Sequence, residues 1–345
     1  MLSDLFLLPF MSALALGAGL SVILLCIPFL RRRLWRSGAR HLGKASLPRL
    51  GGVTMMIAFV GTMLLDSHLV LSREIIGLGV ALVCACIFGL WDDFRELSAK
   101  AQAFLQVVLA VILFVFGMRI TTLRNPFGET FIFSEQGFFS IFFGFMLLLL
   151  WLILVINAVN WLDGLDGLLG SISFITFVVI FFLSLKPEVN QPPVAILAVI
   201  GAGSVLGFLL FNMHPAKLLA GTSGSLFLGT AIAALAVIAG TKIATALLVL
   251  ALPVMDALFV MGERLYFKQS IFRSDKRHLH YKLRELGWSE GAIAWFFFLF
   301  TALVGYLSIK TEALEKFLVM LLVFIFLFLF LVTIASLLYK RKQTH

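Results

Sequence analysis

The stretch that decides the fold is residues 138–170, "FFSIFFGFMLLLLWLILVINAVNWLDGLDGLLG". Its first part carries no charge and is long enough for a helix to cross the hydrocarbon core of a bilayer. Two amides, Asn157 and Asn160, and two carboxylates, Asp163 and Asp166, then follow at intervals of three residues. Because such groups are costly next to hydrocarbon, the stretch predicts a membrane helix that ends at a functional polar site.

The whole chain has the composition of a membrane protein. Of its 345 residues, 61% are hydrophobic and only 13% are charged, far from the usual composition of a soluble domain. The sequence therefore predicts an all-α polytopic integral membrane protein, with residues 1–345 forming a single membrane-embedded domain. Eleven apolar windows are expected to span the membrane: 10–29, 50–65, 74–91, 102–118, 138–157, 168–185, 194–211, 224–239, 243–260, 291–309 and 317–338.

The distribution of lysine and arginine gives the expected orientation. If the loop that carries Arg31 to Arg49 is cytoplasmic and the spans alternate, one side holds 20 basic residues and the other side seven. Basic residues favour the cytoplasmic side, so the N-terminus is expected outside and the C-terminus inside. The net charge of +9 then forms a surface that faces anionic lipid headgroups. Because these residues form no separate domain, no nucleic-acid partner is expected.

A pair of adjacent carboxylates ends one of the predicted spans. Asp92 and Asp93 lie in "GLWDDFRELSAKAQ" (89–102), with Lys100 about two turns later. Neighbouring carboxylates repel each other, so the pair predicts a compensating cation, and Mg²⁺ prefers hard oxygen ligands that it shares with phosphate. A helix cap is the alternative explanation, although a cap requires only one aspartate.

The opening stretch has two interpretations. Spacing by three places Asn157, Asn160, Asp163 and Asp166 on one polar ridge of a helix, and the intervening glycines allow the backbone to approach a ligand. A turn between two spans, with Asp side chains capping the next helix, is the alternative. That alternative explains one aspartate but not four regularly spaced polar residues.

Three further segments carry polar groups near predicted span ends. Residues 221–225, "GTSGS", would present backbone N–H groups and hydroxyls either to a bound anion or to an ordinary helix cap. Residues 274–287 predict a short amphipathic helix with Arg277, His278 and His280, which either contacts a phosphate or sugar or lies on anionic lipid. In 253–259, "PVMDALF", the sequence leaves open whether the intramembrane Asp256 is structural or functional. Residues 119–137 suggest a small hairpin.

Together these segments resemble the polyprenyl-phosphate N-acetylhexosamine-1-phosphate transferases, of the glycosyltransferase 4 type. The resemblance runs in order over most of the chain through six segments: "KASLPRLGG" (44–52), "GLWDD" (89–93), "NAVNWLDGLDGL" (157–168), "FNMHPAK…GTSGSLFLG" (211–229), "PVMDALF" (253–259) and "DKRHLHYKL" (275–283).

The resemblance implies a reaction, a metal and a place in the cell. A polyprenyl (undecaprenyl) phosphate would attack the β-phosphorus of a UDP-N-acetylhexosamine, release UMP and form a lipid-pyrophosphate sugar, with Mg²⁺, or alternatively Mn²⁺, bridging phosphate oxygens. This is the first membrane step of cell-envelope polysaccharide synthesis, in the bacterial inner membrane. By analogy, a homodimer is expected.

The branch implied is that of the undecaprenyl-phosphate N-acetylglucosaminyl 1-phosphate transferases, which start teichoic acid, O-antigen or enterobacterial common antigen synthesis. The muramoyl-pentapeptide transferases carry a Thr-Pro-Thr-Met-Gly-Gly type segment and consecutive histidines. Here the corresponding segments read "SLPRLGG" and "HLHYKL". The His-x-His-His pattern of the N-acetylglucosaminyl branch is itself broken, because Tyr281 stands at its last position.

The resemblance also implies roles for individual residues. Asp92 and Asp93 would be catalytic together with Lys100, and Asn160 would hold the metal. Thr222 stands where the family pattern Gly-Asp-x-Gly-Ser has its magnesium-binding aspartate, and a neutral hydroxyl is a much poorer Mg²⁺ ligand. Substrate contacts are implied for Lys44, Asn157, Asp163, Asp166, Asn212, Arg277, His278 and His280.

Thr222 leaves three explanations open: a chain altered at this position, a natural variant whose metal is held by other groups, or a homologue that has lost activity. Weak metal affinity with retained UDP-sugar binding is therefore expected. Two other classes of function remain as alternatives. One is a secondary transporter of a nucleotide or lipid-linked sugar, which predicts inverted repeats and a mid-bilayer charged site. The other is a non-catalytic member of the same fold.

Overall fold

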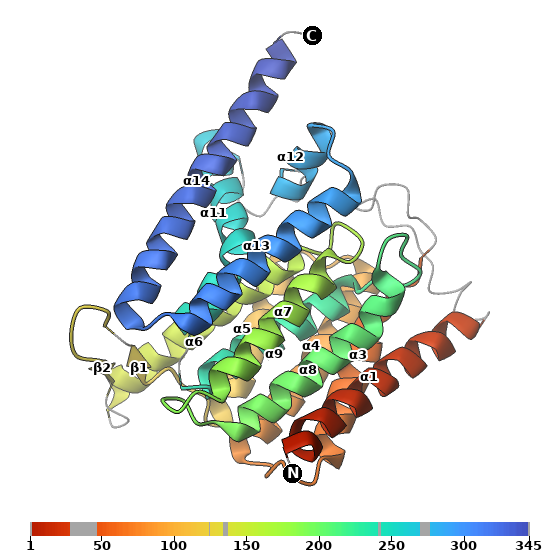
Figure 1. Ribbon diagram of the computed structural model, residues 1–345, viewed down its shortest axis with the longest axis vertical. Helices are drawn as coiled ribbons and strands as arrows, with labels where there is room; N and C mark the ends of the chain where they lie inside the picture. The colour runs from red at the N-terminus through yellow and green to blue at the C-terminus, as the bar shows by residue number, and fades with distance from the viewer. Residues whose placement is uncertain are drawn as a thin grey trace.

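The computed structural model describes residues 2–27, 47–123, 125–133, 137–240, 243–269 and 277–343. In these ranges the chain forms helices and one small hairpin (Figure 1). The elements are α1 (Leu2–Cys26), α3 (Gly51–Leu65), α4 (Arg73–Arg95), α5 (Ala99–Val115), β1 (Thr122–Leu123), β2 (Phe131–Ile132), α6 (Phe138–Asn160), α7 (Leu168–Ser184), α8 (Pro192–Asn212), α9 (Gly221–Ile238), α10 (Ile243–Val249), α11 (Ala251–Tyr266), α12 (Leu279–Glu285), α13 (Glu290–Lys310) and α14 (Ala313–Gln343).

The prediction of an all-α polytopic membrane protein is confirmed. Within the described ranges, seven helices are long and apolar enough to cross a membrane, or eight if the bent pair α10 and α11 is one span. Ten of the eleven predicted windows each coincide with one helix, whereas the window 243–260 is divided between α10 and α11. Helices α3, α5 and α7 are shorter apolar helices. Full spanning by these three helices, and the orientation of the chain, stay predictions. The predicted hairpin is confirmed, with Thr122 opposite Ile132 and Leu123 opposite Phe131 in antiparallel register.

Helix α9 lies at the centre of the helix bundle. It lies among α3, α4 and α6 (Figure 1), and 89% of its apolar window is buried inside the protein. Close approach of the backbones makes this burial possible: a Cβ at Gly89 of α4 would lie 2.3 Å from the Cα of Ser223. A side chain at position 89 would therefore separate α4 from the start of α9, where the polar site lies.

The end of the molecule that carries α12 is the end at which the polar segments meet. In Figure 1, α12 lies towards the C-terminal end of the long axis and the N-terminus lies at the opposite end. Arg341 of α14 donates a hydrogen bond to the carbonyl of Glu285 at the end of α12 (3.0 Å). The chain bends by 77° between α10 and α11, and Pro253 lies in the first turn of α11, where proline is tolerated.

Candidate active site

Asp93 caps the N-terminus of α9 from another helix. Its Oδ1 accepts a hydrogen bond from the backbone N–H of Thr222 (2.9 Å), and its Oδ2 accepts one from Ser223 (3.1 Å). The residue that precedes α9 is Ala220, whose side chain has no oxygen with which to cap the helix. The two N–H groups and the helix dipole both favour a carboxylate here. The cap considered for the Asp92–Asp93 pair therefore exists, but it serves a helix distant in sequence.

Asp92 is buried and held by three donors. Its Oδ2 accepts a hydrogen bond from the hydroxyl of Thr222 (2.8 Å). Its Oδ1 accepts hydrogen bonds from the backbone N–H of Leu97 and from Nε2 of Gln102, both at 2.8 Å. Every oxygen of the Asp92–Asp93 pair therefore has at least one protein donor, which compensates for burial of the two carboxylates.

The segment that follows α6 meets the same helix start. The hydroxyl of Ser225 donates a hydrogen bond to Oδ1 of Asn160 (2.6 Å). The backbone N–H of Gly221 donates to the carboxylate of Asp163. Burial and the nearby Asp93 charge raise the pKa of Asp163 to about 7, against the opposing effects of Arg49 and of the Gly221 N–H. The N–H groups at the start of α9 therefore bind the protein's own carboxylates, which is the capping alternative left open for residues 221–225.

Thr222, one of the two residues expected to hold magnesium, does not fit that role in this arrangement. The Thr222 hydroxyl is a donor to Asp92, so it supplies neither the charge nor the acceptor geometry of a carboxylate ligand. Among the described residues, three His, Cys, Asp or Glu ligand atoms converge within 4.8 Å of one another at Asp166, His214 and Glu290. They do not converge at Asp92, Asp93 and Asp163.

Two asparagines predicted to bind substrate hold other parts of the protein. The Nδ2 group of Asn157 donates hydrogen bonds to Gln106 of α5 (3.0 Å) and to the carbonyl of Ile153 (2.7 Å). Asn212 accepts a hydrogen bond from the backbone N–H of Gly167 (3.0 Å) and donates one to the carbonyl of Leu218 (2.8 Å). A buried amide must satisfy both of its ends. These contacts fix α5 and the loop after α8 against the 157–167 segment.

The second aspartate of the Asp-Gly repeat belongs to a neighbouring cluster. Oδ2 of Asp166 lies 3.1 Å from Nδ1 of His214 and accepts a hydrogen bond from the backbone N–H of Ala216 (3.1 Å). Nδ1 of His214 also lies 3.7 Å from Oε2 of Glu290, whose other carboxylate oxygen pairs with Arg284 (3.1 Å). Asp166 therefore binds the loop after α8, and His214 of that loop lies between Asp166 and the start of α13.

The histidines of the predicted amphipathic segment pack against the 160–166 stretch. The His278 ring stacks on Trp161, with centroids 5.2 Å apart. A Cβ at Gly164 would lie 2.3 Å from Nε2 of His280, so glycine is needed where this ring approaches. Burial lowers the pKa of His280 to about 4, so its ring is neutral at pH 7. The predicted helix is confirmed as α12, shorter than expected, with Leu279 and Leu283 buried.

The basic residues predicted to meet phosphate are placed less tightly. Lys100 is exposed at the second position of α5. The guanidinium of Arg277 lies 5.8 Å from the centre of the Phe267 ring. Lys44 lies outside the described residues. The exposed side chain of Lys100 therefore faces solvent on the α4–α5 side of the cluster.

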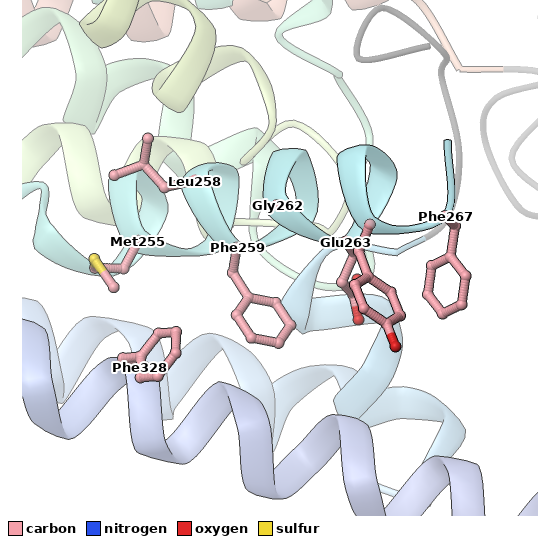
Figure 2. A pocket seen from close by; sticks show the side chains of 8 residues that line it. Met255, Leu258, Phe259, Gly262, Glu263, Phe267 and Phe328 are labelled. Carbon is pink, nitrogen blue, oxygen red and sulfur yellow. The ribbon is translucent and has the colours of Figure 1, made fainter. Parts of the chain in front are cut away.

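An apolar groove lies between α11 and α14 beside this cluster. It has a volume of about 340 Å³. In Figure 2, Met255 and Phe259 point from α11 towards α14, where Phe328 points back. At its edge, Nζ of Lys282 lies 2.8 Å from Oε2 of Glu263 and 4.6 Å from the centre of the Phe259 ring. The groove can take an apolar chain and has a charged pair along one side.

Sequence reasoning missed several partners. Gln102 and Gln106 lie one helical turn apart on α5, and their only signal was this spacing in an apolar helix. Arg49 stands in the quoted "SLPRLGG" segment, yet its charge acts on Asp163. His214 and Glu290 carry no local pattern that links them to Asp166.

Comparisons with known proteins agree with this arrangement. Residues 75–240 match the model of glycosyl transferase family 4. The chain is similar to a probable undecaprenyl-phosphate N-acetylglucosaminyl 1-phosphate transferase of Bacillus subtilis, with 28% identity over 284 residues, 79% of this chain and 76% of the relative. It is also similar to phospho-N-acetylmuramoyl-pentapeptide-transferases. That of Bacillus pumilus is 32% identical over 322 residues, covering 86% of this chain and 96% of the relative.

The corresponding enzyme of Halalkalibacterium halodurans is 33% identical over 306 residues, 83% of this chain and 91% of the relative. These relatives are matched over most of their length, and the family model covers the segments that carry Asp92, Asp93, Asp163 and Thr222. The chain therefore belongs to glycosyl transferase family 4, the membrane enzymes that transfer a sugar phosphate to a polyprenyl phosphate.

Proposed function

We propose that this protein transfers N-acetylglucosamine-1-phosphate from UDP-N-acetylglucosamine to undecaprenyl phosphate. An oxygen of the lipid phosphate forms a bond to the β-phosphorus of the nucleotide sugar. The bond from that phosphorus to the bridging oxygen breaks, and UMP leaves. The observation that carries the proposal is the meeting of four distant segments, 92–93, 160–166, 221–225 and 278–280, at one end of the helix bundle.

The polar cluster supplies the nucleotide side of the proposal. Asp163 and Asp166 are assigned to the nucleoside, because their segment forms the wall on which the α9 start and the histidines converge. Lys100 and Lys44 are assigned to phosphate, since ammonium groups attract it and neutralise charge as the β-phosphorus is attacked. Arg277, His278 and His280 are assigned to sugar or phosphate.

The groove between α11 and α14 supplies the lipid side. Its lining of Met255, Leu258, Phe259 and Phe328 suits a polyprenyl chain. Its position on α11 supports this assignment, because Asp256, the neighbour of Met255, binds the His278 segment. A lipid in the groove would therefore approach the polar cluster from the membrane.

The choice of N-acetylglucosamine rests on the segments "SLPRLGG" and "HLHYKL" and on the Bacillus subtilis relative. The second candidate is transfer of phospho-N-acetylmuramoyl-pentapeptide, favoured by relatives at 32% and 33% identity. We also propose that the protein lies in a bacterial inner membrane as a homodimer. Its N-terminus is outside, its C-terminus is inside, and the polar cluster faces the cytoplasm.

The test is release of UMP by purified protein in detergent with undecaprenyl phosphate. UDP-N-acetylglucosamine and UDP-N-acetylmuramoyl-pentapeptide are supplied separately, and labelled lipid-linked sugar is extracted after long incubation. The proposal expects product from the first donor and at least about ten-fold less from the second, a difference of roughly 1.4 kcal/mol. The reverse preference would identify the second candidate.

Binding measurements separate the remaining alternatives. UDP-N-acetylglucosamine binding without product, even after Asp is placed at 222, indicates a non-catalytic member of the fold. Uptake of nucleotide sugar into proteoliposomes without product indicates a transporter. Glu129→Gln, in the exposed connection of the hairpin, serves as the control that leaves binding and turnover unchanged.

A further inference from the structure

The carboxylate of Asp256 is buried and uses both of its oxygens on one short segment. Oδ2 lies 3.0 Å from Nδ1 of His278, and Oδ1 accepts a hydrogen bond from the backbone N–H of Leu279 (2.8 Å). Asp256 is 4% exposed and His278 is 5% exposed. Helix α11 thus reaches across to hold the residue that precedes α12 and the first residue of α12.

The two contacts determine how the imidazole is oriented. A backbone N–H can only donate, so Oδ1 of Asp256 must accept. A carboxylate at Oδ2 likewise accepts from an Nδ1–H of His278. When one ring nitrogen is fixed as a donor to a carboxylate, the tautomer is fixed, and the other nitrogen is the one left for a ligand. In His278 that nitrogen is Nε2.

The ring is also fixed by stacking. It lies against Trp161 at 5.2 Å with planes 25° apart, and against His280 at 6.2 Å with planes 7° apart. Trp161 directly follows Asn160 and comes two residues before Asp163. The Asp256–His278 contact therefore connects α11 to the segment assigned to the nucleotide.

We propose that Asp256 is a positioning residue for sugar-phosphate transfer: it holds His278 with Nδ1 turned inwards, so that Nε2 is the ring atom presented to the sugar phosphate. The proposal rests on the proposed function. Asp256 does not touch substrate in this account and acts through His278. The same α11 lines the lipid groove with Met255 (Figure 2). One helix therefore sets both the lipid path and the orientation of the histidine.

The decisive variant is Asp256→Asn, because it has nearly the same shape and keeps one oxygen for the Leu279 N–H. Its other atom is an NH₂ group, which donates to Nδ1 of His278 and so moves the ring proton to Nε2. In protein labelled with ¹⁵N-histidine, with the His278 signal assigned by loss in His278→Gln, the shifts should change from the Nδ1–H to the Nε2–H pattern. The matched control is Asp66→Asn, which makes the same change at a carboxylate beside His68 in the α3–α4 connection.

The kinetic expectation for Asp256→Asn is a fall in kcat of about 10- to 100-fold, as for a misplaced reacting group. The KM for UDP-N-acetylglucosamine should change less than about three-fold, since the donor's other contacts remain. These measurements are made in the native chain and with Thr222→Asp, and Asp256→Glu should recover part of kcat because it restores an accepting carboxylate. Asp66→Asn should match its parent.

Two results would overturn the positioning role while leaving the proposed function in place. One is a kcat for Asp256→Asn equal to that of its parent. The other is an unchanged His278 tautomer together with a loss of activity no greater than the loss of folded protein. That result would show that Asp256 only stabilises the fold. Absence of both UMP release and UDP-sugar binding in all chains would instead overturn the proposed function, and this proposal with it.

Discussion

The hydroxyl of Thr222 donates a hydrogen bond to Oδ2 of Asp92 across a distance of 2.8 Å. This contact joins the first turn of α9 to the last turn of α4. An aspartate at 222 would set a second carboxylate against Asp92, and two carboxylates at such a distance repel unless a proton or a cation lies between them. Thr222 satisfies Asp92 without a cation.

Replacing Thr222 by Asp should create a demand for a divalent cation. Without one, we expect Tm to fall by roughly 3–6 °C, corresponding to about 1–2 kcal/mol of repulsion. Millimolar Mg²⁺ should restore Tm and increase UMP release. Thermal melting with and without Mg²⁺, paired with the UMP assay, measures both effects. Thr222→Asn is the uncharged control, and an equal Mg²⁺ shift in the native chain would refute the account of Thr222.

Replacing Gly164 by Ala should destabilise the protein, because the new Cβ would meet Nε2 of His280 at 2.3 Å. Overpacking of this kind typically costs about 1–3 kcal/mol, and the displaced ring should also disturb UDP-sugar binding. The control is Gly61→Ala in α3, where a Cβ meets nothing within 4 Å. Melting curves and a binding titration on both variants test the contact. Equal Tm values for the two variants would show that His280 can move aside freely.

The pH dependence of stability should carry a signature of Asp163. Its pKa is raised from 3.8 to about 7, so between these values the unfolded chain is ionised while the folded chain holds a proton. The stabilisation is full below pH 4 and is lost as pH rises through about 7. Asp163→Asn should therefore remove this loss, and its Tm relative to the native chain should increase from pH 5 to pH 8. A flat difference in Tm across that range would contradict the raised pKa.

Filling the apolar groove should weaken binding of the lipid substrate but not of the nucleotide sugar. Gly262 lines the groove, and a Cβ there meets nothing within 4 Å, so Gly262→Trp can enter the space without a backbone clash. We expect the KM for undecaprenyl phosphate to rise about ten-fold, roughly 1.4 kcal/mol, with little change for UDP-N-acetylglucosamine. Gly61→Trp on α3 is the size-matched control. An equal rise for both substrates would indicate a general disturbance and remove the groove from the lipid path.

The sequence was sufficient to predict the class of fold and to single out the segments that meet at the candidate site. Apolar runs predict membrane helices because no other open structure satisfies the backbone in lipid, and polar residues at the ends of these runs stand out. In the described residues the predicted windows coincide with helices, but α3, α5 and α7 are too short to count as spans on length and composition alone, and one window bends between α10 and α11.

The roles of the polar atoms required the tertiary structure. Asp93 and Asp163 bind backbone N–H groups, and no pattern of side chains in the sequence predicts such contacts. Asn212 has the right neighbours for a ligand site, yet both ends of its amide are used by backbone groups. Asp256 was undecided because its partner, His278, lies 22 residues away on a different element.

The capping of α9 by Asp93 also bears on how the chain is made. The Asp93 carboxylate and the backbone N–H of Thr222, which donates to it, are 129 residues apart in the sequence. Four helices, α5 to α8, lie between them in the chain. During synthesis α4 is made long before α9, so the acid pair at its end first lacks the three donors that α9 supplies. The site is therefore completed late, and a nascent chain that stops before α9 leaves Asp93 without the N–H groups that it caps.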